Sequence, residues 1–386
     1  AEVLRGSGYV IVTASDGRGK SRVVWDGPAP QVHETALSGR GHTDFWVWEK
    51  TPAPLSGERD DGTLPDDFPG PRGGGHLRVV HWLGRDDPAS KGAKLVPFHE
   101  PKERPQGRTW DRGGGNNAYS SAMHKTESVD YGIMLTGERK IILDDGELVM
   151  QPGDIVIQVG SGHQWDSARL GCLMAFDMIS ARFVDGPAGT AQGNDATMRA
   201  EPNRKLPEGV KPARRIVTID REPGKSSVVS DGPSPDVRTD PARPGFAWQR
   251  MWVTDSAPAK IVYETLHLPH VIEPPANGSV LSVATFPPDA AWKGKMGESE
   301  VKAFFRTMGS PGASTYSPQA PHPYMQKTRT LDFCCVLEGE ITLVLDTQEV
   351  HLKAGEIVVQ RGANHAWSNR SGKRAIVAIA SHDGSH

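Results

Sequence analysis

The chain has 386 residues, of which 37% are hydrophobic, and its formal net charge is −3. This length accommodates two β-domains, and the small net charge gives no electrostatic basis for binding nucleic acid or an anionic membrane. No apolar run approaches the roughly 20 residues that span a bilayer. Residues 1–8 lack the apolar core of a secretory signal. We therefore expect a cytoplasmic protein whose partner is neither a nucleic acid nor a membrane.

The three cysteines are Cys172, Cys334 and Cys335. Neighbouring side chains in a strand point to opposite faces, so the two adjacent cysteines are poorly placed to form a disulfide. We expect buried, reduced thiols, as in cytosolic proteins.

The second half of the chain repeats the first, with the matching segments in the same order and at nearly constant spacing. Such a repeat indicates a tandem duplication and fixes the architecture. The matching segments are residues 19–30 and 224–235, residues 125–130 and 327–332, and residues 163–165 and 365–367.

In chain order, short apolar runs alternate with Gly, Pro and Asp, a pattern typical of short strands joined by tight turns. Each copy is predicted to open with a strand, at residues 9–13 and 215–219. The Gly- and Pro-rich stretch 52–75 is predicted to be a surface loop, and the polar stretch 189–211 a linker. One helix is predicted at 298–306, with Val301, Phe304 and Phe305 facing inward.

These elements predict an all-β fold of two β-barrel or sandwich domains in tandem. The repeat places the N-terminal domain at residues 1–205, with a core at about 118–182. The C-terminal domain is placed at residues 206–386, with a core at about 320–381.

The stretch 123–166 combines this strand pattern with two histidines and a carboxylate, His124, Asp130 and His163. Residues 124, 126 and 130 have the same parity, which is consistent with an inward-facing row. A straight strand of six residues spans roughly 20 Å. His124 and Asp130 therefore approach each other only if the chain turns between them.

Both halves resemble cupin domains. The segment from Asp130 to Gly137 is similar to the end of the first cupin motif, with Asp in place of Glu, and Gly153 and His163 are similar to parts of the second motif. In the second half, Asp332 to Gly339, Gly355 and His365 repeat the similarity. The resemblance implies a bicupin, with two double-stranded β-helix (jelly-roll) barrels and a turn that brings the acid to the strand beside the first histidine.

The resemblance also implies a metal site formed by His124, Asp130 and His163, with Thr126 in the position of a further motif histidine. Two imidazoles and one carboxylate are the ligand set of non-haem iron sites, and they also suit manganese, nickel or zinc. The cofactor prediction is thus one divalent transition metal, with iron first, or none. An alternative is that Asp130 only holds a hydroxyl or an amide and that His163 only packs beside Trp165.

In the second half, Gln326 replaces the first histidine. A weaker second metal site is predicted at His322, Asp332 and His365, and the C-terminal copy is expected to be mainly structural. His163, Asp130 and Tyr131 are the predicted catalytic residues, and the pocket is predicted to include Thr126, Trp165, His81 and Trp82.

Family analogy favours metal-dependent dioxygenase-type oxidoreductase chemistry on a small aromatic, organic-acid or polyketide-like molecule. Two alternatives stay open: a metal-free isomerase, cyclase or lyase that uses His163 and Asp130 as acid and base, and a non-catalytic small-molecule-binding protein. A monomer and a homodimer are both compatible with the duplication.

Overall fold

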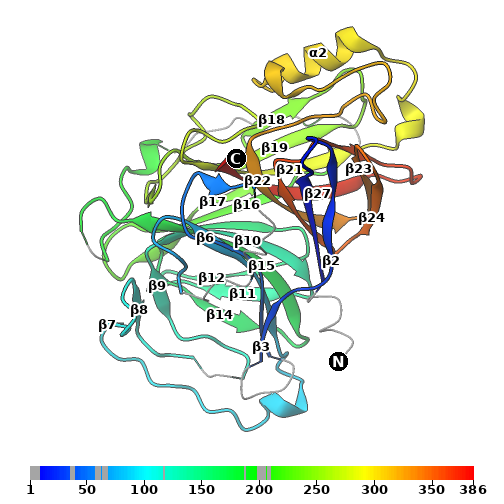
Figure 1. Cartoon of the computed structure of the whole chain (residues 1–386). Helices are drawn as coiled ribbons and strands as arrows, with labels where there is room; N and C mark the ends of the chain where they lie inside the picture. Colours follow the sequence, from blue (N-terminus) through cyan, green and yellow to red (C-terminus); the bar gives the residue numbers. More distant parts are fainter. Residues whose placement is uncertain are drawn as a thin grey trace.

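The computed structural model describes residues 9–34, 40–56, 62, 68–115, 118–186, 188–197, 206 and 210–386. It contains two β-barrels, one above the other in Figure 1, which confirms the predicted all-β fold of two tandem barrels. Part of the predicted linker and the boundary at residue 205 lie outside the described residues. In the described part of the chain, no helix combines the length and the apolarity needed to cross a membrane.

The N-terminal barrel consists of a nine-stranded sheet and a three-stranded sheet that faces it. The central strands are buried along their whole length, because one face of the large sheet lines the barrel interior and the other packs against the second barrel. The large sheet has the order β17 (Ser226–Pro233), β16 (Arg214–Asp220), β13 (Ile155–Val159), β10 (Ser128–Thr136), β15 (Cys172–Arg182), β6 (Gly75–Trp82), β4 (Gly41–Trp48) and β3 (Gln31–Glu34), with β20 (Ala259–Lys260) paired to β15; the small sheet has the order β12 (Glu147–Met150), β11 (Arg139–Ile142) and β14 (Gln164–Ser167).

The C-terminal barrel repeats this arrangement strand for strand, as the sequence repeat requires. Its large sheet has the order β18 (Asp236–Thr239), β19 (Ala247–Thr254), β21 (Ser279–Phe286), β27 (Ala375–Ser385), β22 (Thr330–Glu338), β25 (Ile357–Arg361), β1 (Tyr9–Ser15) and β2 (Ser21–Pro28), with β5 (Ala53–Pro54) paired to β27; its small sheet has the order β24 (Glu349–Lys353), β23 (Glu340–Leu345) and β26 (His365–Ser368).

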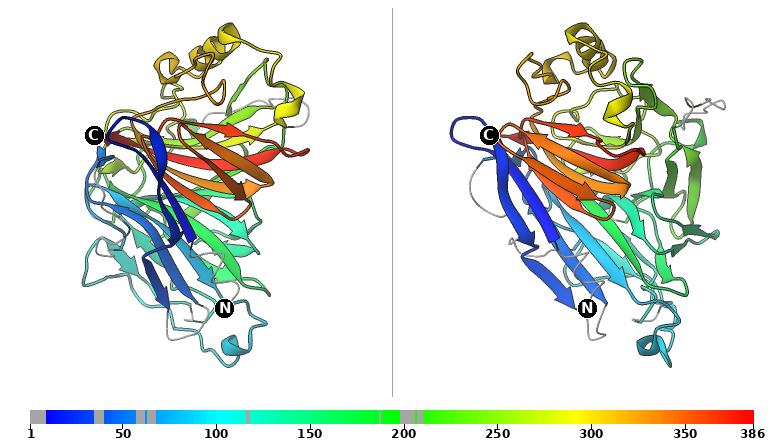
Figure 2. Two further views of the ribbon diagram at one scale, coloured as in Figure 1. Left: turned by 45° about the vertical axis from the view of Figure 1, so that its right-hand side comes forward. Right: turned by 90° about the vertical axis from the view of Figure 1, so that its right-hand side faces the viewer.

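The two copies exchange their first hairpins. The N-terminal hairpin β1–β2 joins the C-terminal barrel, where β1 pairs in parallel with β25, and the blue hairpin lies against the orange and red strands in Figures 1 and 2. Conversely, β16 pairs in parallel with β13 of the N-terminal barrel. The division at residues 205 and 206 thus follows the sequence repeat, but the sheets cross it.

The main hydrophobic core lies between the barrels. It contains residues from the outer faces of both large sheets, including Val79 and Tyr131 from one and Leu281 and Phe333 from the other. Cys172, Cys334 and Cys335 are buried free thiols, as predicted. The two barrels therefore share one core and form a single packed unit.

The helix α2 (Glu298–Thr307) forms at the predicted position and buries the predicted residues Val301, Phe304 and Phe305. The Glu300 carboxylate accepts a hydrogen bond from the Gly297 backbone N–H at its N-terminus (2.8 Å). Its buried side chains belong to the core of the C-terminal barrel, and the helix covers the end of that barrel at the top of Figure 1.

Shorter elements complete the described chain. Part of the predicted loop 52–75 forms β5, and part lies outside the described residues. The remaining elements are β7 (Lys102–Glu103), β8 (Thr109–Asp111), β9 (His124–Thr126), η2 (Pro88–Ser90), η3 (Asp195–Thr197), η4 (Asp289–Ala291) and η5 (Pro311–Ala313).

The hairpin exchange makes a direct prediction. Residues 1–205 and 206–386, produced separately, are each expected to aggregate, because each half leaves a buried parallel strand edge without its partner. Produced together, the halves are expected to co-elute as a one-to-one complex in size-exclusion chromatography. Two separately soluble halves, each with a cooperative thermal transition, would contradict this prediction and would show that each first hairpin can also close the barrel of its own copy.

Candidate functional site

A cavity of about 340 Å³ lies inside the N-terminal barrel, between the large and the small sheet. Along β6 and β15 the lining residues alternate, because successive side chains of a strand point to opposite faces. The lining residues are Arg40, His42, Phe68, Arg78, Val80, Trp82, Arg104, Asp111, Ser121, Ala122, His124, Asp130, Arg139, Gln158, His163, Trp165, Phe176 and Met178.

Two of the predicted site residues, His124 and His163, lie side by side in this cavity. Their backbones exchange two hydrogen bonds, of 2.9 and 2.8 Å, and their ring centroids are 4.3 Å apart. In each ring Nδ1 contacts a backbone carbonyl, that of Ala122 at 2.8 Å and that of Ser161 at 2.9 Å. These contacts fix Nδ1 as the N–H donor, so Nε2 of each neutral ring carries the free lone pair.

Burial disfavours the charged form of both imidazoles. It lowers the pKa of His124 to about 4, and it lowers the pKa of His163 well below its usual value, with a further contribution from His124. Both rings are therefore neutral at neutral pH and offer a lone pair to a metal ion or a ligand.

Asp130 lies on β10 in the same cavity wall, between Gln158 and Met178 on the neighbouring strands. The Ser128 hydroxyl donates to its carboxylate, and Thr126 contacts Ser128 at 2.7 Å. Asp130 Oδ1 is buried and has no hydrogen-bond partner among the described residues. Burial raises the pKa of Asp130 to about 7, so this carboxyl exchanges a proton near neutral pH.

The predicted metal triad is only partly assembled. Nε2 of His124 and Nε2 of His163 are suitable ligands for a transition metal. In the described part of the chain, three His, Cys, Asp or Glu donors that all lie within 4.8 Å of one another occur at His33, His42 and Asp44, not at His124, Asp130 and His163. The structure therefore supplies an imidazole pair that fits a metal, while Asp130 does not complete the set.

Arg139 is the residue of the site that sequence reasoning missed. It lies on β11 with 1% exposure, and its guanidinium carbon is 4.5 Å from the ring centre of Trp82 and 4.9 Å from that of Trp165. Its Nε and Nη1 atoms are buried without hydrogen-bond partners among the described residues. Burial lowers the pKa of Arg139 to about 10, so the group stays positively charged at neutral pH.

Further positive charge surrounds the cavity. Arg40 lies 3.8 Å from the ring centre of Trp82, and burial lowers its pKa to about 10, with a further contribution from Arg139. Two other cavity arginines pair with carboxylates: Arg78 with Asp44 at 2.7 Å and Arg104 with Asp111 at 2.9 Å. Arg139 therefore contributes a buried positive charge to the cavity, with two N–H groups that are unpaired within the described part of the chain, and these groups can bind an anion.

Comparison of the two sequence copies could have identified Arg139 as a functional residue. Arg139 pairs with Met150 across β11 and β12, and the matching position of the second copy is Ile341, which pairs with Leu352. An arginine that replaces isoleucine at a buried position in one copy only indicates a function other than folding.

Several predicted residues lie elsewhere. Tyr131 follows Asp130 on the same strand and so faces the opposite side, in the core between the barrels, where its hydroxyl contacts Ser279 at 2.8 Å. Trp82 and Trp165 line the cavity, whereas His81 and Thr126 do not. Thr126 instead supports Asp130 through Ser128.

In the C-terminal barrel, side chains nearly fill the interior space that matches this cavity. The matching space measures about 20 Å³ and is lined largely by aromatic side chains. Gln326 and His365 contact each other through Nε2 atoms at 3.2 Å, and Asp332 accepts a hydrogen bond from Thr330 at 3.0 Å. His322 points to Asp289 instead, at 3.7 Å. The three predicted second-site residues are therefore not brought together as one cluster.

Comparison with known proteins gives short but specific matches. Residues 312–380 match the family model described as the cupin domain. The chain is 54% identical over 48 residues to Phomopsin biosynthesis cluster protein C' of Diaporthe leptostromiformis, covering 12% of this chain and 25% of that protein. It is 52% identical over 46 residues to the cupin-domain-containing oxidoreductase virC of Hypocrea virens, covering 12% of this chain and 24% of that protein. The chain thus spans about a quarter of the length of these relatives.

Among solved structures, the chain is similar to a quercetin 2,3-dioxygenase from Acinetobacter baumannii, with 11% identity and a TM-score of 0.35 over 92% of this chain and 84% of that one. The family match covers much of the C-terminal barrel, and the N-terminal barrel has the same strand order. Residues 312–380 therefore carry a cupin domain, and the N-terminal barrel repeats its strand arrangement.

Proposed function

We propose that this chain is an oxidoreductase-type enzyme that binds a small aromatic anion, such as a carboxylate or a phenolate, in the cavity of the N-terminal barrel. One observation carries the proposal. The polar groups of Asp130, Gln158 and Arg139 line the cavity, are buried, and include atoms without hydrogen-bond partners among the described residues. Unpaired buried polar atoms are destabilising, and a polar ligand in the cavity would pair them.

The reaction class rests on the relatives. Three of them are described as cupin-domain-containing oxidoreductases, among them virC of Hypocrea virens and fogC of Aspergillus ruber. Because the matches to virC and fogC cover about a quarter of each relative, they support the class of reaction and leave the substrate to be inferred from the cavity.

The ligand class follows from Arg139. A guanidinium presents two parallel N–H donors that match a carboxylate, and such charge-assisted pairs are short and strong. Trp82 and Trp165 contact the same guanidinium and also line the cavity, so an aromatic ring beside the anionic group would pack against indole surfaces. The volume of about 340 Å³ suits one small molecule.

Proton transfer is assigned to Asp130. With a pKa of about 7 and Oδ1 unpaired in the cavity wall, Asp130 can accept a proton from a ligand or return it near neutral pH. His124 and His163 offer two neutral Nε2 atoms at the same cavity. A divalent transition metal held by these two atoms would supply Lewis-acid or dioxygen chemistry there.

A metal-free isomerase, cyclase or lyase is the second candidate. It is favoured by one observation: Asp130 has the properties of an acid–base group and does not form a three-donor cluster with the histidines. The two candidates differ in their requirement for metal and dioxygen.

The test has two stages. Titration with benzoate and with benzamide, followed by tryptophan fluorescence, is expected to show saturable binding of the anion and at least tenfold weaker binding of the amide. Aromatic acids that bind are then incubated with and without Fe²⁺ in an oxygen electrode, with His163→Ala as the matched variant. Oxygen uptake that needs both iron and His163 is the expected result.

Product formation that is equal without oxygen or metal would instead support the metal-free candidate. Tight binding without turnover under any condition would support a non-catalytic binding protein. Equal binding of benzoate and benzamide would contradict the anion assignment.

A further inference from the structure

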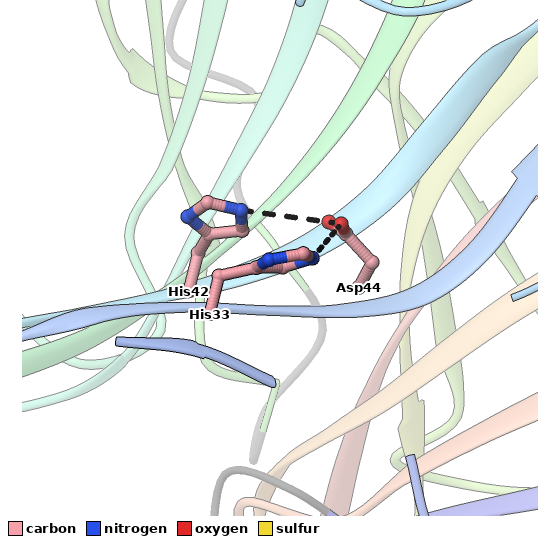
Figure 3. Close-up of side chains that lie close together, drawn as sticks. All are labelled: His33, His42 and Asp44. Atoms are coloured by element: carbon pink, nitrogen blue, oxygen red, sulfur yellow. Dashed lines mark ion pairs between the residues drawn. The ribbon is translucent and has the colours of Figure 1, made fainter. Parts of the chain in front are cut away.

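A second group of ligating side chains lies at the outer edge of the N-terminal sheet, on the hairpin of β3 and β4. His33 of β3 is directly opposite His42 of β4, and Asp44 lies two residues further along β4 on the same face. Figure 3 shows both imidazoles directed at the Asp44 carboxylate. Three donors from two adjacent strands therefore converge on one point.

The distances are close to those of a metal site. His33 Nε2 is 3.5 Å and His42 Nε2 is 4.0 Å from Asp44 Oδ2, and one donor atom of each residue lies within 4.8 Å of the others. Donors held about 2.1 Å from a tetrahedral ion lie roughly 3.4 Å apart. Changes of up to about 1.4 Å in the distances between the donor atoms would close this site around an ion.

The carboxylate is held in place for this role. Asp44 is fully buried, and Oδ1 accepts a hydrogen bond of 2.7 Å from Arg78 Nε. Oδ2 accepts a longer hydrogen bond of 3.4 Å from Arg78 Nη2 and is also the oxygen that lies near the two histidines. An outer partner that orients a ligating carboxylate in this way is a usual component of metal sites, although the positive charge of Arg78 weakens cation binding relative to a carboxylate alone.

The second copy provides an internal comparison. In the C-terminal barrel, β18 pairs with β19 in the matching register, and both hairpins are followed by the same irregularity against the next strand. The positions of His33, His42 and Asp44 are there occupied by Arg238, Trp248 and Arg250. The fold does not require the three ligating side chains, so their presence in one copy needs another reason.

We infer that His33, His42 and Asp44 form a binding site for a divalent transition-metal ion, separate from the pair His124 and His163. Imidazole nitrogens with one carboxylate oxygen suit Zn²⁺, Ni²⁺, Cu²⁺ or Fe²⁺. His42 and Arg78 also line the ligand cavity, so the ion would lie in the cavity wall and would fasten the edge strand β3 to β4. This inference goes beyond the proposed function and does not depend on it.

The experiment is calorimetric titration of the full chain, without affinity tag, with Zn²⁺, supported by elemental analysis after dialysis. His33→Arg, which introduces the residue of the second copy, is the main variant because His33 is partly exposed and does not line the cavity. His163→Ala separates this site from the other histidine pair. His351→Ala is the control, because His351 is an exposed histidine 3.3 Å from a single carboxylate, that of Glu340.

We expect His33→Arg to remove one equivalent of bound Zn²⁺, or to weaken its binding at least tenfold, and to leave the circular dichroism spectrum unchanged. His163→Ala and His351→Ala are expected to retain that equivalent. Unchanged Zn²⁺ binding in His33→Arg would overturn the inference, whether or not His163→Ala loses an equivalent. The absence of bound Zn²⁺ in the unmodified chain would also overturn it. If His33→Arg loses the native circular dichroism spectrum, Zn²⁺ binding is measured in His42→Gln instead, and the same outcomes apply.

Discussion

Arg139→Ile is expected to weaken binding of an aromatic carboxylate by about 10- to 100-fold and to keep the protein folded. A hydrogen-bonded contact with a charged group contributes about 1.5–3 kcal/mol, and each 1.4 kcal/mol corresponds to a factor of ten in affinity. Isoleucine occupies the matching buried position of the second barrel, as Ile341. Replacing a buried charged group by a well-packed hydrophobic side chain is often neutral or stabilising, so we expect the melting temperature to stay equal or to rise.

Fluorescence titration with benzoate and thermal unfolding without ligand measure the two effects independently. Arg169→Ile is the matched control, because the Arg169 side chain is 84% exposed and lies outside the cavity. Unchanged benzoate affinity in Arg139→Ile would show that Arg139 does not hold the anion. A large fall in melting temperature would show that its charge supports the fold instead.

Asp130→Asn is expected to stabilise the metal-free protein above pH 7 and to slow the reaction by about 10²- to 10⁴-fold. The folded pKa of about 7 lies above the ordinary value of 3.8, so the folded state binds the proton more tightly than the unfolded chain. This contribution to stability is present below about pH 4 and is lost as the pH rises through 7. The difference between these two pKa values corresponds to a change in the free energy of unfolding on the order of 4 kcal/mol.

The difference in unfolding free energy between Asp130→Asn and the unmodified chain is therefore expected to grow from pH 4 to pH 7 and then to level off. His124 and His163 act in the opposite direction, since their lowered pKa values cause stability to be lost as the pH falls below about 6.5. Both proteins contain the two histidines. Subtracting the unfolding free energy of the unmodified chain from that of Asp130→Asn at each pH therefore removes most of the histidine contribution. Asp86→Asn, at an exposed carboxylate, is the control, and a difference that does not vary with pH would show that Asp130 keeps an ordinary pKa.

The sequence by itself determined the duplication, the two-barrel fold and the helix at 298–306. These features depend on local patterns: repeated segments, short apolar runs between turn residues, and inward spacing of Val301, Phe304 and Phe305. The resemblance to cupins also led to His124 and His163, which the fold does bring together. Strand alternation could have excluded Tyr131 from the site, because it is the neighbour of inward-facing Asp130.

Only the tertiary structure decided which barrel receives each first hairpin. The two copies have matching sequences there, so residues 9–28 are compatible with either barrel, and the pairing of β1 with β25 depends on which strand edge is open in space. The positions of the charged and ligating side chains in the N-terminal barrel are likewise decided by the tertiary structure. The position of Arg139 between two indoles and the convergence of His33, His42 and Asp44 follow from strand register and from packing between distant segments. Residue type sets the chemistry that each side chain can perform, but the distances that combine those chemistries are set by the assembled sheets.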